Sequence, residues 1–328
     1  MKAWRVDEPG EPRDVLRLDD VPDLEPGPQE LLVRVRAAAA NFPDVLLCRG
    51  MYQVKPTPPF TPGIELCGEV VGIGAQAPGG FAVGDRVIGS PELPSGAFAE
   101  LSVMAAERAF PAPEALDDAE AAAFFIGYQT GWFGLHRRAR LQPGEVLLVH
   151  AAAGGVGSAA VQLGKAAGAS VIGVVGSPDK ADVARRLGAD VVVDRHSEDF
   201  VSVVKEVTGG RGADVVYDPV GGEAFTRSTK CVAFEGRLLV IGFASGDIPK
   251  AALNHALIKN YAILGLHWAL YQQRDPAAIR ACHDELCKLA ADGLAAPLVS
   301  ESLGLDGVAE AVQRLADGET VGRVTFQP

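Results

Sequence analysis

The stretch from residue 147 to residue 168, LLVHAAAGGVGSAAVQLGKAAG, decides the fold. Its apolar start is typical of a buried strand, and its small-residue end is typical of a helix. Between them lies AAGGVG at residues 152–157, which is the dinucleotide-binding fingerprint with its first glycine replaced by alanine. The stretch therefore predicts a strand, a tight turn and a helix whose N-terminus faces a negatively charged group.

Four residues of this turn have distinct expected roles. Gly154 lets the backbone approach a pyrophosphate, and Gly157 lets the helix pack closely on the strand. The amides of Gly155 and Val156 point outward at the helix N-terminus, where the helix dipole favours negative charge. A plain strand–turn–helix packing motif is the alternative, but the strand–helix units that follow favour dinucleotide binding.

The residues around this turn alternate between buried-strand runs and helical stretches. Such alternation predicts a doubly wound, six-stranded parallel sheet, which is an α/β Rossmann fold. The predicted strands are 145–150, 170–175, 190–194, 214–218, 237–242 and 261–266, and the predicted helices are 158–167, 179–187, 198–208, 223–232 and 276–291.

The first 110 residues have a different pattern. Short apolar runs, among them ELLVRVRAA and GDRVIG, alternate with turns that are rich in proline and glycine. This spacing predicts a β-rich, barrel-like unit. The run GRVTFQP at residues 322–328 is predicted to be a closing strand.

Composition narrows the classes of function. The 328 residues carry a net charge of −12, which disfavours nucleic acid and anionic membranes as partners. The five cysteines match no disulfide framework or zinc ribbon, so we expect reduced thiols. The beginning of the chain has no apolar run of the signal-peptide type, and no stretch of about 18 uncharged apolar residues occurs. These features predict a soluble, cytoplasmic protein.

The second predicted strand bears on the choice of dinucleotide. An acidic residue about 20 positions after the fingerprint would bind the 2′-hydroxyl of NAD, but Gly176 and Ser177 stand at that place. We predict that Ser177, Lys180 and Arg195 surround a 2′-phosphate and that the cofactor is NADPH. The alternative is that the two cations are solvated surface charges, and Asp179 is the main argument against a phosphate.

Two later strand ends complete the predicted cofactor site, because ligands of such sheets bind beyond the carboxyl ends of the strands. The fourth strand ends in YDPVGG, and the fifth ends in VIGFAS. We predict cofactor contacts from Val220, Gly242, Phe243 and Ala244. For the glycines, turn geometry alone is the alternative explanation.

Over nearly its whole length the chain resembles the medium-chain dehydrogenase/reductase superfamily, and within it the zinc-free quinone oxidoreductase branch. The motifs that carry the resemblance include PFTPGIELCGEV, GDRVIG, GAFAE, HAAAGGVG, RLGAD and YDPVGG. The resemblance implies a GroES-like catalytic domain at 1–122 and 267–328, with the Rossmann NADPH-binding domain inserted at 123–266.

The resemblance also implies that no metal is bound. Zinc-dependent relatives have metal ligands where this chain has Asn41, Ile64 and, in the third case, an apolar residue near Ile126. A remnant ligand set of Asp44, Glu65 and Cys67 is the alternative, and we expect it to be empty. The group Cys282, His283 and Cys287 is expected to pack within one helix.

Without a zinc Lewis acid, the acceptor has to carry its own electron sink, as quinones and conjugated carbonyls do. The resemblance thus implies an NADPH:quinone oxidoreductase. Its expected catalytic residues are Asn41, Asp44 and Tyr52, with Thr130 near the nicotinamide ribose and Arg323 in the cofactor-binding set. Asn41 as a helix cap and Tyr52 as a packing residue remain the structural alternatives.

Three other functions stay open at this point. The chain is alternatively an enoyl-thioester reductase of the acrylyl- or crotonyl-CoA type, or a non-enzymatic, crystallin-like NADPH-binding protein. A zinc alcohol dehydrogenase is nearly excluded by the missing ligands. We also expect a homodimer, because the apolar strand at 260–266 follows the family pattern of an edge strand that pairs with its copy.

Overall fold

The computed structural model describes residues 1–78 and 80–328. The chain divides into two compact units, Met1–Ile126 with Ala296–Pro328, and Gly127–Ala295. Helix α4 (Phe125–Trp132) crosses the boundary between them. The segment 267–295, which the resemblance assigns to the GroES-like domain, lies in the second unit in this division.

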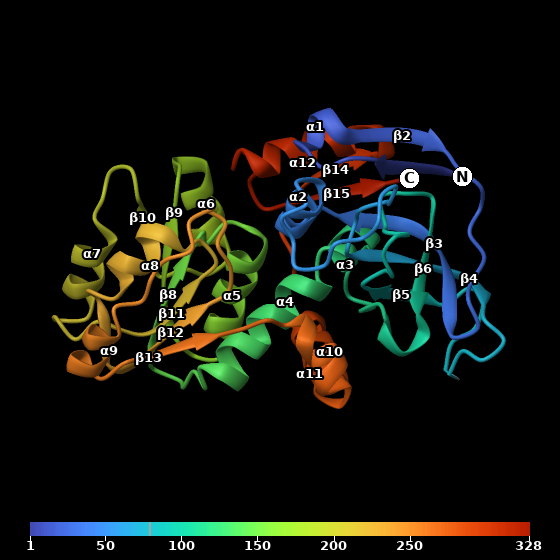
Figure 1. Ribbon diagram of the computed structural model, residues 1–328. Helices are drawn as coiled ribbons and strands as arrows, with labels where there is room; N and C mark the ends of the chain where they lie inside the picture. Colours follow the sequence, from blue (N-terminus) through green and yellow to red (C-terminus); the bar gives the residue numbers. More distant parts are fainter. Residues whose placement is uncertain (79) are drawn as a thin grey trace. The chain divides into compact units, whose positions relative to one another are not determined.

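The second unit contains the predicted Rossmann sheet. Its six strands are ordered β10-β9-β8-β11-β12-β13, and every neighbouring pair is parallel. Helices α5 to α8 flank this sheet (Figure 1). The strands are β8 (Val146–His150), β9 (Ser170–Val175), β10 (Val191–Asp194), β11 (Ala213–Asp218), β12 (Val232–Val240) and β13 (Ala262–Gly265).

Five helices of this unit begin close to the residues that the strand–turn–helix pattern predicts. Ser177 and Asp199 cap two of them through side-chain oxygens, and Pro178 starts one at its first position. After α4, the helical segments are η2 (Phe133–Arg138), α5 (Gly155–Ala166), α6 (Pro178–Arg186), α7 (Phe200–Val207), α8 (Gly222–Ser228), α9 (Leu253–Lys259), α10 (Ala269–Arg274) and α11 (Pro276–Ala291).

Several features differ from the sequence-based expectation, and the helical segments α4, η2 and α10 were not predicted. The helix predicted at 223–232 ends at Ser228, because Val232 already pairs with Ala213 as the first residue of β12. Helix α9 was not predicted. Its apolar residues face outward, so no amphipathic pattern marks it against a core.

The first unit is β-rich, as predicted. Its main sheet is ordered β14-β15-β3-β4-β5-β7, with β6 paired to β3, and a separate hairpin joins β1 and β2. The strands are β1 (Lys2–Val6), β2 (Leu16–Asp20), β3 (Glu30–Ala39), β4 (Leu66–Ile73), β5 (Arg86–Gly89), β6 (Leu101–Ala105), β7 (Ala109–Pro111), β14 (Val299–Gly304) and β15 (Arg323–Gln327). The helical segments are α1 (Pro12–Val15), α2 (Phe42–Cys48), η1 (Ala106–Arg108), α3 (Asp118–Ala122), η3 (Leu305–Gly307) and α12 (Val308–Ala316).

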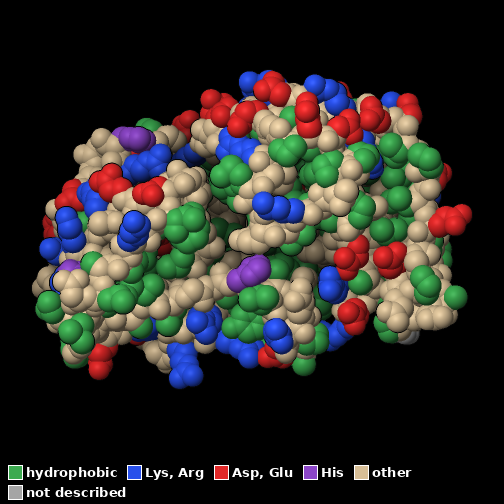
Figure 2. All heavy atoms as spheres, in the orientation of Figure 1, with side chains coloured by type: hydrophobic (Ala, Val, Ile, Leu, Met, Phe, Trp, Pro, Cys, Tyr) green, Lys and Arg blue, Asp and Glu red, His purple; other side chains and the backbone are tan. Residues whose placement is uncertain are grey.

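Acidic and basic side chains are interspersed over the face that Figure 2 draws. Within the described ranges, no helix is both long and apolar enough to cross a membrane.

Candidate cofactor and catalytic sites

The glycine turn of the second unit is built around Ala151, which adopts a left-handed backbone with φ of 50°. Its carbonyl oxygen accepts the N–H of Gly154 at 2.8 Å. A side-chain carbon added at Gly157 would lie 2.1 Å from the same oxygen, and one added at Gly154 would lie 3.2 Å from it. Gly157 is therefore required by the turn itself, and at Gly154 even a methyl group would be tight.

This turn leaves polar groups open at the start of α5. Gly154 is the N-cap residue and offers no side chain to the helix. Among the described residues, the N–H groups of Gly155 and Val156 donate to no protein acceptor. A 12-residue helix with open amides at its N-terminus suits a pyrophosphate, so the residues present fit a dinucleotide.

The end of β9 gathers the predicted phosphate-binding residues. The guanidinium group of Arg195 lies over Gly176, where an added side-chain carbon would be 3.2 Å from its central carbon. Burial, and then repulsion from Arg195, lower the pKa of Lys180. Ser177 accepts the N–H of Lys180 at 3.4 Å as the cap of α6, and its hydroxyl hydrogen remains able to donate. Two cations held this close are stabilised by a dianion such as a 2′-phosphate.

The loops after β11 and β12 are joined to each other. Ala244 N–H donates to the carbonyl of Pro219 at 3.0 Å, and Ser245 N–H donates to that of Val220 at 3.0 Å. The buried carboxylate of Asp218 accepts the N–H groups of Val220 and Gly221 at 2.8 and 3.0 Å. Asp218 thereby shapes the loop that carries Val220, a role that the sequence pattern does not reveal.

The remaining residues of the predicted cofactor set lie near the same strand ends or on a helix beside them. Gly242 and the partly exposed Phe243 follow the end of β12. Thr130 is buried in α4, and its neighbour Gly131 packs on α5, where an added carbon would lie 2.7 Å from Leu163. No hydrogen bond joins Thr130 to the strand ends among the residues described.

The first unit contains a buried ion pair between Glu65 and Arg323. The side chains are 0% and 4% exposed, and Arg323 Nη2 lies 2.8 Å from Glu65 Oε2. The other oxygen, Glu65 Oε1, accepts the N–H of Ile126 at 2.7 Å. Burial raises the pKa of Glu65, while Arg323 acts in the opposite direction.

Asn41 completes this cluster. Its Nδ2 donates to Glu65 at 2.8 Å and to the carbonyl of Ala39 at 3.1 Å, and its Oδ1 accepts from Arg323 at 3.2 Å. Both donor hydrogens of Asn41 are therefore used by the protein itself. Of the three guanidinium nitrogens of Arg323, Nη1 and Nη2 donate hydrogen bonds, and Nε has no partner among the described residues.

Asp44 is a second buried carboxyl group in this unit. Its oxygens accept the N–H of Asn41 at 2.9 Å and the N–H of Gly63 at 3.0 Å. Burial raises the pKa of Asp44 to about 7 despite these two donors. Asp44 thus links the start of α2 to the segment before β4, and both segments lead to the Asn41–Glu65 pair.

Tyr52 is half-buried and packs against the core of the first unit. Burial, followed by the charge of Asp44, raises the pKa of its phenol. In the described part of the chain its hydroxyl makes no hydrogen bond. It is therefore a neutral donor that the fold has left available.

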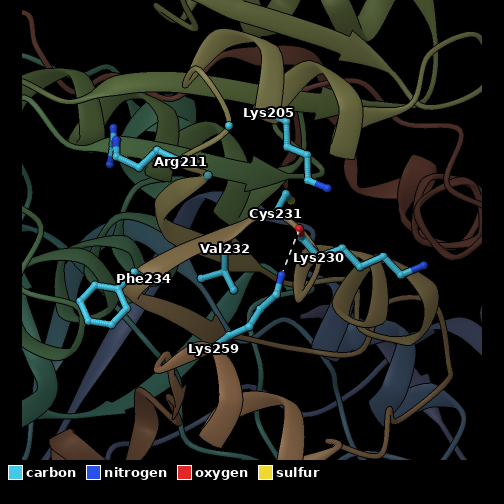
Figure 3. Close-up of a pocket in the computed structure, with 9 residues that line it drawn as sticks. Lys205, Arg211, Lys230, Cys231, Val232, Phe234 and Lys259 are labelled. Atoms are coloured by element: carbon cyan, nitrogen blue, oxygen red, sulfur yellow. Dashed lines mark hydrogen bonds between the residues drawn. The ribbon is translucent and has the colours of Figure 1, made fainter.

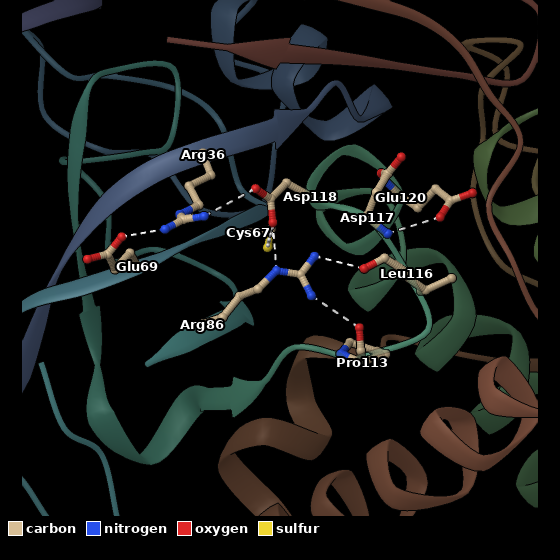
Figure 4. Close-up of polar contacts among 9 residues, drawn as sticks. All are labelled: Arg36, Cys67, Glu69, Arg86, Pro113, Leu116, Asp117, Asp118 and Glu120. Carbon is tan, nitrogen blue, oxygen red and sulfur yellow. Dashed lines mark hydrogen bonds and ion pairs between the residues drawn. The ribbon is translucent and has the colours of Figure 1, made fainter. Parts of the chain in front are cut away.

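A polar network fixes Cys67 and the turn before α3 (Figure 4). Arg86 Nε donates to Asp118 at 2.6 Å, and its terminal nitrogens donate to the carbonyls of Pro113 and Leu116. The Cys67 thiol donates to Asp118 at 3.6 Å, and burial raises its pKa to about 12. Cys67 stays protonated, which makes it a poor metal ligand.

The residues of the alternative remnant ligand set, Asp44, Glu65 and Cys67, do not fit a metal. Glu65 is held by Arg323, Asn41 and an amide, and Cys67 keeps its proton. No group of three or more His, Cys, Asp or Glu side chains in residues 1–78 and 80–328 could hold an ion. In α11, the Cys287 sulfur lies 3.4 Å from His283 Nε2, and burial raises the pKa of Cys287 to about 11.

Comparison with known proteins identifies the family. The first unit and the Rossmann sheet define a dinucleotide-binding oxidoreductase of the two-domain type. The alcohol dehydrogenase GroES-like domain model matches residues 27–114, and the zinc-binding dehydrogenase model matches residues 155–284. The chain belongs to the medium-chain dehydrogenase/reductase superfamily, among its quinone oxidoreductase-like members.

Three relatives illustrate the similarity. The chain is 38% identical to a quinone oxidoreductase-like protein 2 homolog of Nematostella vectensis, over 92% of this chain and 82% of that protein. It is 36% identical to a quinone oxidoreductase of Pseudomonas aeruginosa, over 96% of each. The crystal structure of Escherichia coli quinone oxidoreductase complexed with NADPH matches with a TM-score of 0.92 and 30% identity, over 100% of both chains.

Proposed function

We propose that this chain is an NADPH-dependent reductase that transfers hydride to a quinone or a related conjugated carbonyl and that works without zinc. The observation that carries the proposal is the strand end at which Lys180 and Arg195 lie together beside the glycine turn. The NADPH complex of the Escherichia coli relative supports the same cofactor.

Most of the residues that would hold NADPH follow the ends of five strands of the Rossmann sheet, β8 to β12. The amides of Gly155 and Val156 bind the pyrophosphate, and Ser177, Lys180 and Arg195 bind the 2′-phosphate. Bound NADPH supplies the hydride. The other proposed contacts are Gly154, Gly157, Thr130, Val220, Gly242, Phe243 and Ala244, and the family resemblance adds Arg323 to this set.

The proposed catalytic roles in the first unit differ among three residues. Tyr52 donates a hydrogen bond to the acceptor oxygen as negative charge develops on it, since its hydroxyl is not used by the protein. Asn41 has no donor hydrogen to spare, so we assign it to holding Glu65 and Arg323 in place. Asp44 acts as a positioning residue through the N–H of Asn41.

The proposed independence from zinc rests on the chemistry of the first unit. The guanidinium of Arg323 forms an ion pair with Glu65, so this carboxylate is already neutralised and does not serve as a metal ligand. An acceptor that delocalises its own negative charge does not require a Lewis acid, which is why we propose quinones and enones and not simple ketones.

A panel of acceptors tests this function. Initial rates of NADPH oxidation are measured with a quinone, an enone, an enoyl-CoA and a simple ketone, for the wild type and for Tyr52→Phe. We expect turnover of the quinone and the enone, and a larger loss in Tyr52→Phe for the enone, on the order of 10²-fold, because its enolate is the more basic anion.

Other results of this panel would contradict the proposal. Fastest turnover of the enoyl-CoA would make the chain an enoyl-thioester reductase. NADPH binding without turnover of any acceptor would favour a non-enzymatic role. Equal rates of Tyr52→Phe and wild type on both conjugated acceptors would remove Tyr52 from the mechanism.

We also propose that the protein forms a homodimer through β13. This strand is the last in the sheet order, and within residues 1–78 and 80–328 it pairs with β12 alone. The preceding helix α9 exposes Leu253, Leu257 and Ile258, each at more than 70%. An unpaired edge beside exposed apolar side chains is a surface that soluble proteins usually cover.

A further inference from the structure

A basic pocket lies at the amino-terminal ends of the neighbouring strands β11 and β12 (Figure 3). It encloses about 380 Å³ beside Gly212, which precedes β11, and Val232, which begins β12. The predicted cofactor residues follow the other ends of these strands, so the pocket is a separate place in the same unit. Four of its residues are cationic, namely Lys205, Arg211, Lys230 and Lys259.

Most of this positive charge is not neutralised by carboxylates. Arg211 pairs with Asp214. Lys205 and Lys230 form no ion pair among the described residues. Lys259 Nζ lies 3.4 Å from the carbonyl oxygens of Thr229 and Lys230, and it forms no ion pair with a carboxylate in the part of the chain that the structure describes. Three unpaired lysines at one pocket stand out in a chain whose net charge is −12.

The dipoles of three helices neutralise part of the positive charge of these lysines, but not all of it. Helices α7, α8 and α9 end close to Lys205, Lys230 and Lys259 in the sequence, and lysines favour helix C-termini. Three helix ends supply about −1.5 elementary charges against three positive ones. A net positive charge remains, and Lys205 and Lys259 also act to lower the pKa of Cys231, which burial raises to about 12.

Phe234 adds an aromatic surface to the pocket. Its side chain is 68% exposed although it belongs to β12, and Figure 3 shows its ring on the other side of Val232 from Lys205. Exposed aromatic rings stack on planar ligands, and lysines bind phosphate as point charges. We propose that this pocket is a second binding site, for a nucleotide whose phosphates contact the lysines and whose base stacks on Phe234.

Calorimetric titration of ADP into the protein tests the proposal after the cofactor site has been filled with NADPH. NADPH fluorescence is recorded in parallel, so any displacement of the cofactor is visible. We expect one ADP to bind per chain without displacement. Lys205→Gln and Lys259→Gln should each weaken ADP about tenfold, because each removes one charge-assisted contact with phosphate. Both variants should keep the NADPH affinity of the wild type.

Matched variants and probes make the test specific. Lys250→Gln removes an exposed lysine outside the pocket and should leave ADP binding unchanged. Phe234→Ala should weaken ADP and leave the binding of inorganic pyrophosphate unchanged, because pyrophosphate has no base to stack.

Four results would overturn the proposal. They are the absence of ADP binding, its persistence at full strength in both lysine variants, displacement of NADPH in step with ADP binding, and pyrophosphate binding as tightly as ADP. Lysine-dependent binding of a single-stranded oligonucleotide in preference to ADP would identify a nucleic-acid surface and would equally reject a nucleotide site.

Discussion

In the first unit, one buried ion pair connects two segments that are far apart in the sequence. Glu65 and Arg323 are 258 positions apart, and both are almost fully buried. Removing one partner of such a pair leaves an uncompensated charge, which costs about 3–5 kcal/mol, whereas replacing both is much less harmful. The pair therefore joins the closing strand β15 to the beginning of β4, where Asn41 is also held.

We predict that Glu65→Gln and Arg323→Met each lower the unfolding free energy by about 3 kcal/mol or more, and that the double variant loses less than the sum. Urea unfolding of the three variants measures this coupling. The exposed pair Arg13 and Glu310 is the control, and its loss should change the unfolding free energy far less, because solvent screens both charges. Strictly additive losses for the buried pair would show that the two residues do not act together.

We also propose that single residues decide a preference for NADPH over NADH. Replacing Lys180 and Arg195 together by alanine should raise the Kd of NADPH by about 100-fold, because each contact of a cation with the 2′-phosphate is worth about tenfold. The Kd of NADH should hardly change. Arg186→Ala, on the same helix, serves as the control, and both constants follow from fluorescence titration. Equal losses for NADH and NADPH would reject the phosphate site.

At the scale of elements, the strand–helix pattern predicts the Rossmann sheet, but it does not predict the backbone geometry of individual turns or the partners of buried side chains. The buried runs have the composition of central strands, and helices α6, α7 and α11 have a side-chain cap or a proline at the start. The left-handed Ala151 could not be expected, since alanine is rarely found in that conformation. The partnership of Glu65 with Arg323 depends on long-range packing that no periodicity encodes.

His150 connects strand β8 to Ser228 in helix α8 through a buried hydrogen bond. Ser228 donates its hydroxyl to Ala224, so it accepts from Nε2 of a neutral His150 at 2.8 Å. Burial lowers the pKa of His150 from 6.5 to about 4. Between these pH values His150 binds a proton in the unfolded chain but stays neutral in the folded chain. Its contribution to the unfolding free energy is therefore fully present above pH 6.5 and is lost as the pH falls towards 4.

We therefore predict that His150→Gln removes part of the acid sensitivity of the protein. The difference in unfolding free energy between pH 7 and pH 4 should be smaller than in the wild type, by about 3 kcal/mol. The exposed His196→Gln should leave this difference unchanged. An unaltered pH dependence in His150→Gln would mean that His150 titrates in the folded state as it does in the unfolded chain.

For the whole molecule, assembly is the first property to measure. We expect light scattering at micromolar concentration to give twice the 34.2 kDa mass of the chain. The double substitution Leu257→Glu and Ile258→Glu should shift the mass towards one chain, because it places charges on the exposed face of α9. The control Val83→Glu changes an exposed residue of the first unit and should leave the measured mass unchanged. A wild type that scatters as a single chain contradicts the dimer.

The most direct test of the whole account is the rate of quinone reduction by NADPH before and after exhaustive treatment with a chelator, with the metal content measured on the same samples. If the chain's own side chains and NADPH are sufficient, less than one zinc per chain is found and the rate is unchanged. A rate that falls with chelation and returns on addition of zinc would contradict the account, and so would the absence of quinone reduction from the start.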